Sequence, residues 1–104
     1  MPDVYKEHLA IRYKEGLLYR SAGWPFAKIA VYRDRIVLSS LFASNELLKK
    51  DIVSMKKGKF NVIWDVVYIT SKKDGRVFMV QSFNFENLVE KLREFGYKVD
   101  TKAV

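Results

Sequence analysis

The chain has 104 residues, carries a formal net charge of +7 and contains one histidine and no cysteine. Its length indicates one domain, and its 49 % hydrophobic content suffices for a single core, which excludes an intrinsically disordered chain. The lack of cysteine excludes disulfides, thiol catalysis and cysteine-ligated metals, and no apolar run approaches the roughly 20 residues of a membrane helix.

Alternating apolar and polar residues predict β-strands in most of the chain. The first predicted strand covers residues 9–19, with a bulge or turn at Glu15-Gly16. Residues 21–25 then break the run, because their glycine permits positive φ and their proline lacks an N–H for a ladder. Strands over 26–32 and 36–41 follow, and the tight connection between them predicts a hairpin.

The second half is predicted to continue as short strands. Residues 45–51 indicate one helical turn or a loop, and residues 56–59 are typical of a turn that contains a glycine. The strongest hairpin signal is Asp74-Gly75, which suits a type I′ turn or its bulged relative. The predicted strands of this half cover residues 52–55, 60–64, 66–70 and 77–81. The uncharged run 60–64 is either an edge that pairs with a neighbour or an internal strand.

One amphipathic helix is predicted at the end of the chain. Asn84 suits an N-cap, Glu86 lies in the first turn, where the helix dipole favours an acid, and Gly96 suits the position that stops the helix. The apolar stripe at helical spacing consists of Leu88, Val89, Leu92 and Phe95.

About seven strands that each bury one face must roll into a barrel or two packed sheets. Such a fold has an open end that exposes apolar core residues, and the apolar stripe of the helix also needs to be buried. We therefore expect the helix to pack over this open end. Its expected contacts are Ile36, Leu38, Ile69 and Phe78.

Four stretches of the chain resemble a known family. They are Trp24-Pro25 followed by residues 27–32; residues 33–38; Asp51-Ile52-Val53-Ser54-Met55; and Val77-Phe78 with Ser82, Asn84 and the helix to Phe95-Gly96-Tyr97. The order of elements resembles the pleckstrin-homology superfold, and the local sequence resembles its prokaryotic pleckstrin-homology-like or GRAM-like branch. The resemblance implies one domain over residues 1–104, with a core at about 9–97, and a mainly β barrel or orthogonal sandwich of about seven antiparallel strands capped by one C-terminal helix.

The resemblance also implies functions. The family's best-known activity is binding phosphoinositide headgroups through basic residues around the first hairpin loop. The corresponding loop here, residues 21–26, has only Arg20 and Lys28 beside it. Prokaryotic members are often oligomers, which implies a homo-oligomeric binding module.

Three groups of basic residues flank predicted turns and form a candidate anion-binding rim. They are Arg33 and Arg35; Lys56, Lys57 and Lys59; and Lys72, Lys73 and Arg76. Alternate turns of an up-and-down sheet share one end, so we expect these cations to face the same phosphates of RNA, DNA or acidic lipid headgroups. The alternative is that they are ordinary solvated turns.

Aromatic residues offer two further interpretations. Trp24, Pro25 and Phe26 lie in a predicted loop, and an exposed tryptophan there suits a protein contact. Aromatic residues between cations in the first half also suit stacking of single-stranded bases, although aromatics commonly fill strand faces.

No residue pattern predicts catalysis. His8 stands alone, and the aspartates at predicted turns suit capping rather than acid–base chemistry or metal binding. We therefore expect no enzyme, cofactor or metal, but a binding or assembly module that contacts itself or another protein. The alternative is a nonspecific binder of nucleic acid or another polyanion. A cysteine-free composition rich in Lys, Glu and Arg, without a signal-peptide pattern, is typical of a heat-adapted cytoplasmic protein.

Overall fold

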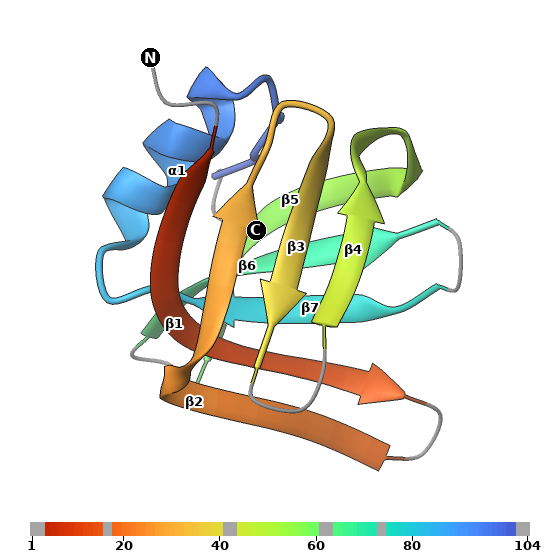
Figure 1. The fold of residues 1–104 in the computed structure, drawn as a ribbon, viewed down its shortest axis with the longest axis vertical. Helices are drawn as coiled ribbons and strands as arrows, with labels where there is room; N and C mark the ends of the chain where they lie inside the picture. The colour runs from red at the N-terminus through yellow and green to blue at the C-terminus, as the bar shows by residue number, and fades with distance from the viewer. Residues whose placement is uncertain (1–3, 16–17, 41–43, 61–63, 73–74, 102–104) are drawn as a thin grey trace.

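The computed structural model describes residues 4–15, 18–40, 44–60, 64–72 and 75–101, and within them all side chains except those of 13–15, 18–26 and 60. The described chain forms seven strands, one 3-10 turn and one α-helix (Figure 1). In order these are β1 (Tyr5–Glu15), β2 (Leu18–Val31), β3 (Arg35–Ser39), β4 (Ser44–Leu48), the 3-10 turn Lys49–Asp51, β5 (Ile52–Phe60), β6 (Trp64–Ser71), β7 (Val77–Gln81) and α1 (Phe85–Glu94).

All seven strands belong to one antiparallel sheet with the order β4-β3-β2-β1-β7-β6-β5. The strongly bent β1 connects two parts of the sheet, so that β3 and β4 cross the direction of β5, β6 and β7 (Figure 1). The prediction of a mainly β fold with about seven antiparallel strands and a C-terminal helix is confirmed. This arrangement is consistent with a sandwich or barrel of the pleckstrin-homology-like type.

The predicted break at residues 21–25 is wrong, because β2 runs through it. The irregular sequence instead appears as a register shift: Leu9 pairs with Ala27 and Ile11 with Ala22, which leaves residues 23–26 opposite Ala10 alone. An excess of residues on one strand bends the pair, as a β-bulge does. Glu15 pairs with Leu18, so the chain passes from β1 to β2 between these residues and not at residues 21–26; residues 16–17 lie outside the described part.

The predicted turn at residues 56–59 is also wrong, because β5 is continuous from Ile52 to Phe60. Gly58 lies within the ladder, paired with Val66, and a Cβ at this position would meet the ring of Tyr68 at 2.0 Å. The glycine is thus needed for a close side-chain approach and not for a turn.

Two further strand predictions need correction. Residues 60–64 do not form one strand, because Phe60 ends β5, Trp64 begins β6, and the two residues pair with each other. Residues 61–63 between them lie outside the described part. Polar residues 45–51 hold the short strand β4 as well as the predicted helical turn.

The C-terminal helix packs as the apolar stripe predicts. Leu88 and Leu92 are fully buried, Phe95 is nearly so, and all three join the core that contains Ile36, Leu38, Ile69 and Phe78. Asn84 Oδ1 accepts a hydrogen bond from the Asn87 amide at 3.3 Å, which caps the helix. Gly96 ends it with φ of +90°. The predicted packing of the helix against the core is confirmed.

The segment after α1 covers part of the β5 edge. Asp100 forms an isolated parallel bridge with Lys56: the Lys57 amide donates to the Asp100 carbonyl at 2.8 Å, and the Asp100 amide donates to the Met55 carbonyl at 2.9 Å. The terminal strand of the sheet therefore has its backbone groups partly satisfied from the same chain.

Candidate functional site

The predicted protein contact at Trp24, Pro25 and Phe26 lies on the irregular part of β2, opposite Ala10. The side chains of these three residues lie outside the described part. A contact through Trp24 therefore stays a prediction.

Two of the three basic groups reach a common rim. The Lys49 amide donates to the Asp34 carbonyl at 2.9 Å, and the Lys72 amide donates to the Asp51 carbonyl at 2.6 Å. The 3-10 turn Lys49–Asp51 thus joins the β2–β3 connection, with Arg33 and Arg35, to the β6–β7 connection, with Lys72 and Arg76. Lys73 lies outside the described residues.

The third basic group lies elsewhere. Lys56, Lys57 and Lys59 are inside β5, and Lys59 pairs with Asp65 at the end of the hairpin opposite Ser71. The prediction of one rim with all three groups is therefore wrong. Asp65 Oδ1 lies 2.5 Å from Lys59 Nζ and 3.8 Å from Lys57 Nζ. The close ion pair with Lys59 lowers the pKa of Asp65; burial opposes this shift, and the charge of Lys57 adds to it.

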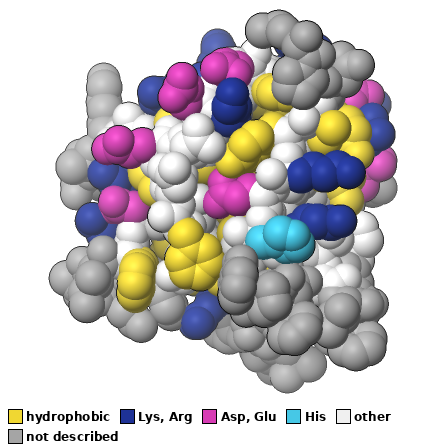
Figure 2. Space-filling view, turned by 60° about the vertical axis from the view of Figure 1, so that its left-hand side comes forward, with side chains coloured by type: hydrophobic (Ala, Val, Ile, Leu, Met, Phe, Trp, Pro, Cys, Tyr) yellow, Lys and Arg dark blue, Asp and Glu magenta, His cyan; other side chains and the backbone are white. Residues whose placement is uncertain are grey.

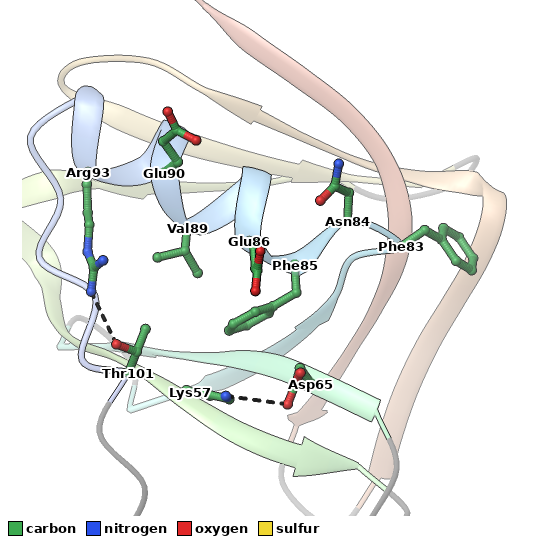
Figure 3. A pocket seen from close by; sticks show the side chains of 10 residues that line it. All are labelled: Lys57, Asp65, Phe83, Asn84, Phe85, Glu86, Val89, Glu90, Arg93 and Thr101. Atoms are coloured by element: carbon green, nitrogen blue, oxygen red, sulfur yellow. Dashed lines mark hydrogen bonds and ion pairs between the residues drawn. The ribbon is translucent and has the colours of Figure 1, made fainter.

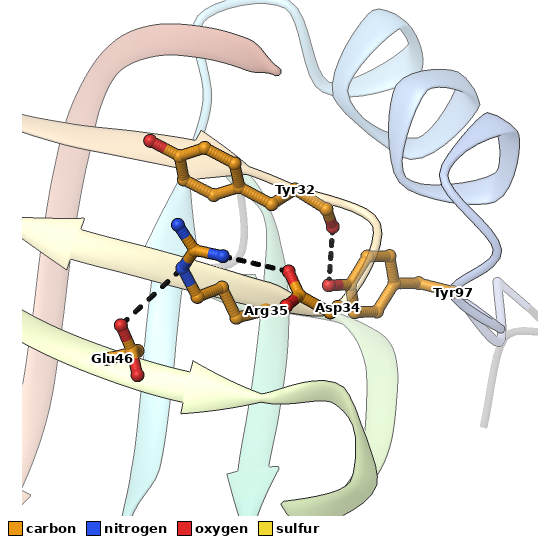
Figure 4. Close-up of polar contacts among 5 residues, drawn as sticks. All are labelled: Tyr32, Asp34, Arg35, Glu46 and Tyr97. Carbon is orange, nitrogen blue, oxygen red and sulfur yellow. Dashed lines mark hydrogen bonds and ion pairs between the residues drawn. The ribbon is translucent and has the colours of Figure 1, made fainter. Parts of the chain in front are cut away.

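Several cations of the rim bind groups of the protein itself, and Figure 4 shows the contacts of one of them, Arg35. Arg35 lies 2.9 Å from Asp34 Oδ1 and 3.5 Å from Glu46 Oε2, and its guanidinium stacks over the Tyr32 ring at 4.1 Å. Arg76 Nη1 donates to Asn45 Oδ1 at 3.1 Å. Lys49 Nζ donates to the Phe95 carbonyl at 2.9 Å, where it complements the C-terminus of α1. These contacts give the rim a structural role.

Tyr97 links the rim to the segment after α1 (Figure 4). Its hydroxyl donates to the Tyr32 carbonyl at 2.7 Å. Burial raises the pKa of Tyr97 to about 12; the charge of Asp34 adds to the shift and that of Arg35 opposes it.

Strongly alkaline solution is therefore expected to destabilise the fold through Tyr97. An unfolded tyrosine ionises near 10, whereas Tyr97 keeps its proton to about 12. The stabilisation is complete below pH 10 and is lost as the pH rises through 12. Urea unfolding measured across this range should show a steeper loss of stability in the wild type than in Tyr97→Phe. Equal slopes in the two proteins would contradict the assignment.

A second polar cluster, which the sequence did not predict, ties β1 to the start of α1. Glu7 accepts hydrogen bonds from the Tyr5 hydroxyl at 2.6 Å and from the Ser82 hydroxyl. Asn87 Nδ2 donates to the Tyr5 hydroxyl at 3.0 Å. Burial and Glu7 raise the pKa of Tyr5 to about 12. Ser82 is buried and also accepts from the Asn84 amide, so this cluster positions the helix and offers no accessible nucleophile.

A groove lies between α1 and the β5–β6 hairpin (Figure 3). Its volume is about 550 Å³, and it is lined by Lys57, Asp65, Phe83, Asn84, Phe85, Glu86, Val89, Glu90, Arg93 and Thr101. Phe85, Glu86 and Val89 point from the helix toward the strands, and Phe83 and Glu90 stand at the margins (Figure 3). Phe83 is 67 % exposed, which is unusual for a large apolar side chain beside a groove.

The basic side chains in the groove have partners within the described residues, whereas the acidic side chains that α1 contributes to it do not. Lys57 is paired with Asp65 and lies 5.6 Å from the Phe85 ring centroid, while Arg93 donates to the Val99 carbonyl at 2.8 Å. Glu86 and Glu90 form no hydrogen bond or ion pair with the described residues. The groove therefore combines an apolar floor with two acidic groups that a ligand can reach.

Nowhere in the described part of the chain do three His, Asp or Glu side chains come close enough to hold a metal ion. Among the same residues, no helix has the length and apolar character that crossing a bilayer requires. No protein-family model matches the chain, and no curated protein matches it.

Proposed function

We propose that this chain is a non-catalytic binding module that holds a segment of a protein partner in the groove between α1 and the β5–β6 hairpin. The observation that carries the proposal is a groove of about 550 Å³ with Phe83 exposed at its margin and Phe85 on its floor. Exposed aromatic side chains at concave sites commonly supply most of the energy of protein binding.

The groove favours a particular partner chemistry. Phe85 and Val89 offer contact to an apolar anchor residue. Glu86 and Glu90 are four residues apart on the same side of the helix, about 6 Å along its axis. A segment with an apolar anchor next to Lys or Arg complements both features. We propose such a basic, amphipathic segment as the ligand.

Membership of the prokaryotic pleckstrin-homology-like or GRAM-like branch is part of the same proposal. It is supported by the order of seven strands and one capping helix and by the four stretches that resemble the family. The family resemblance also supports self-association, and the composition supports a cytoplasmic location.

The test uses synthetic peptides that carry one Leu or Phe anchor flanked by either Lys or Glu. The Lys-flanked peptides should bind and shift the backbone amide NMR signals of Phe83, Glu86 and Val89. Phe83→Ala should weaken binding about tenfold, or ~1.4 kcal/mol. Glu86→Gln with Glu90→Gln should remove the preference for Lys-flanked peptides.

Glu94→Gln is the matched control, because Glu94 is on the same helix but pairs with Lys91 Nζ at 3.3 Å and does not line the groove. Equal binding of Lys- and Glu-flanked peptides, or signal shifts away from the groove, would contradict the proposal. A light-scattering mass of two chains that falls to one in Phe83→Ala would identify a second copy as the occupant.

A further inference from the structure

Charged side chains are divided between the two faces of the sheet. Successive residues of a strand point to opposite faces, and the core residues Leu9, Ile29, Met55, Ile69 and Phe78 define the inner face. The outer face of β2, β1, β7, β6 and β5 carries four exposed cations and no acid among the described residues. These cations are Lys6, Arg12, Lys28 and Lys56.

Two acids border this face: Asp100 is the bridge partner of Lys56, and Glu46 lies on the outer side of β4 beside Arg35. The acids nearest to α1 lie on the other side of the sheet. Glu7 and Asp65 point to the side of α1, and the helix itself carries Glu86, Glu90 and Glu94. Figure 2 shows acidic and basic side chains mixed on its left-hand side, whereas the histidine lies next to basic side chains. The helix side is therefore mixed in charge, whereas the described outer side chains of β2, β1, β7, β6 and β5 are cationic, with the acids Glu46 and Asp100 at the margins of the face.

One row of side chains crosses the centre of this outer face. Arg12 pairs with Met79, Met79 with Tyr68, and Tyr68 with Lys56, on the successive strands β1, β7, β6 and β5. At about 4.8 Å between strands the row spans roughly 14 Å. Tyr68 and Met79 are partly exposed in its middle, and the two cations are exposed at its ends.

The row also has aromatic and uncharged neighbours. Trp64 lies on the same face of β6, four residues from Tyr68, and is 48 % exposed. The remaining partly exposed positions near the row include Ser54, Thr70 and Gln81, all uncharged. Val66, between Trp64 and Tyr68, is fully buried, so other side chains cover the strand between the two aromatic residues.

We propose that this outer face, centred on the row Arg12–Met79–Tyr68–Lys56, binds single-stranded nucleic acid. Lys and Arg at both ends of the row attract phosphates, while Tyr68 and Trp64 offer ring faces on which bases stack. A lipid surface would use the cations but would not need the ring of Tyr68. The face is distinct from the groove beside α1, so this inference does not depend on the proposed function.

Fluorescence anisotropy of a labelled oligothymidylate over a salt series tests the proposal. The wild type should bind at low salt, and Arg12→Gln with Lys56→Gln should weaken binding at least tenfold. The slope of log K against log salt concentration is negative, and each lost phosphate contact makes it shallower by about 0.7. The slope of the double variant should therefore be shallower than that of the wild type by about 1.4. The matched control is the double variant Lys91→Gln with Lys98→Gln, which removes two positive charges from the side of α1. Its slope of log K against log salt concentration should equal that of the wild type.

Substitutions of Tyr68 test the contribution of base stacking separately from that of charge. Tyr68→Phe keeps the ring and should bind as the wild type does, whereas Tyr68→Leu should bind several-fold more weakly while melting cooperatively. No binding by the wild type at low salt, or equal slopes for the two double variants, would overturn the proposal. So would binding to phosphatidylglycerol vesicles that is tighter than to the oligonucleotide and unchanged in Tyr68→Leu.

Discussion

Leu92→Ala is expected to lower the free energy of unfolding by about 2–5 kcal/mol. Leu92 is fully buried among core residues of the sheet, so its loss removes apolar contacts and leaves a cavity. The total free energy of unfolding of a small domain is only about 5–15 kcal/mol, so the variant should melt at a much lower temperature. Urea unfolding measures the change.

Glu90→Ala is the control for Leu92→Ala, because it changes an exposed residue of the same helix and should alter stability by less than about 0.5 kcal/mol. A chain that ends at Phe83 extends the test, because it lacks the whole of α1 and the segment after it. We expect this truncated chain to be unfolded or aggregated. A soluble truncated chain that melts cooperatively would show that the sheet does not need the helix.

Gly58→Ala is expected to destabilise the protein by about 1–3 kcal/mol, as overpacking does. A Cβ at this position would lie 2.0 Å from Cε2 and 2.5 Å from Cδ2 of Tyr68, so the ring must move. In a Tyr68→Ala background, Gly58→Ala should change the free energy of unfolding only slightly, because the ring that obstructs the Cβ is absent. Denaturant unfolding of the four proteins of this double-mutant cycle gives the coupling energy.

An equal cost of Gly58→Ala with and without Tyr68 would show that backbone conformation, and not the ring, requires the glycine. The φ angle of Gly58 lies outside the positive range that Gly75 and Gly96 adopt, which favours the explanation by packing.

The periodic elements of the fold were predictable from the sequence because their signals are local. Helix α1 is marked by its own N-cap Asn84, its stripe and the terminating Gly96, all within the helix or beside it. The positive φ of Gly75 was predictable for the same reason, whereas its partner in the predicted turn, Asp74, lies outside the described residues. Gly58 misled the prediction, because a glycine required by a side chain ten residues away looks in sequence like one required by a turn.

The binding surfaces were harder to predict, because they combine distant segments. The groove draws on β5, β6, α1 and Thr101, and the only local signal was Phe83, an apolar residue just before the helix cap that the core did not need. The outer face depends on strand register: Arg12 and Lys56 share a row only through β7 and β6. The alternation of Lys6, His8 and Arg12 along β1 was visible in sequence, but its partners were not.

The position of β1 in the sheet affects how the protein can be synthesised. Residues 10–13 of β1 pair with residues 78–81 of β7, so one edge of β1 stays unpaired until the ribosome has made most of the chain. At about 5–20 residues per second, the growing chain exposes this edge for some seconds after β4 has emerged. Nascent chains on the same messenger could pair through it. Slower translation after residue 48 should therefore increase aggregation, and a chaperone that covers β1 should reduce it.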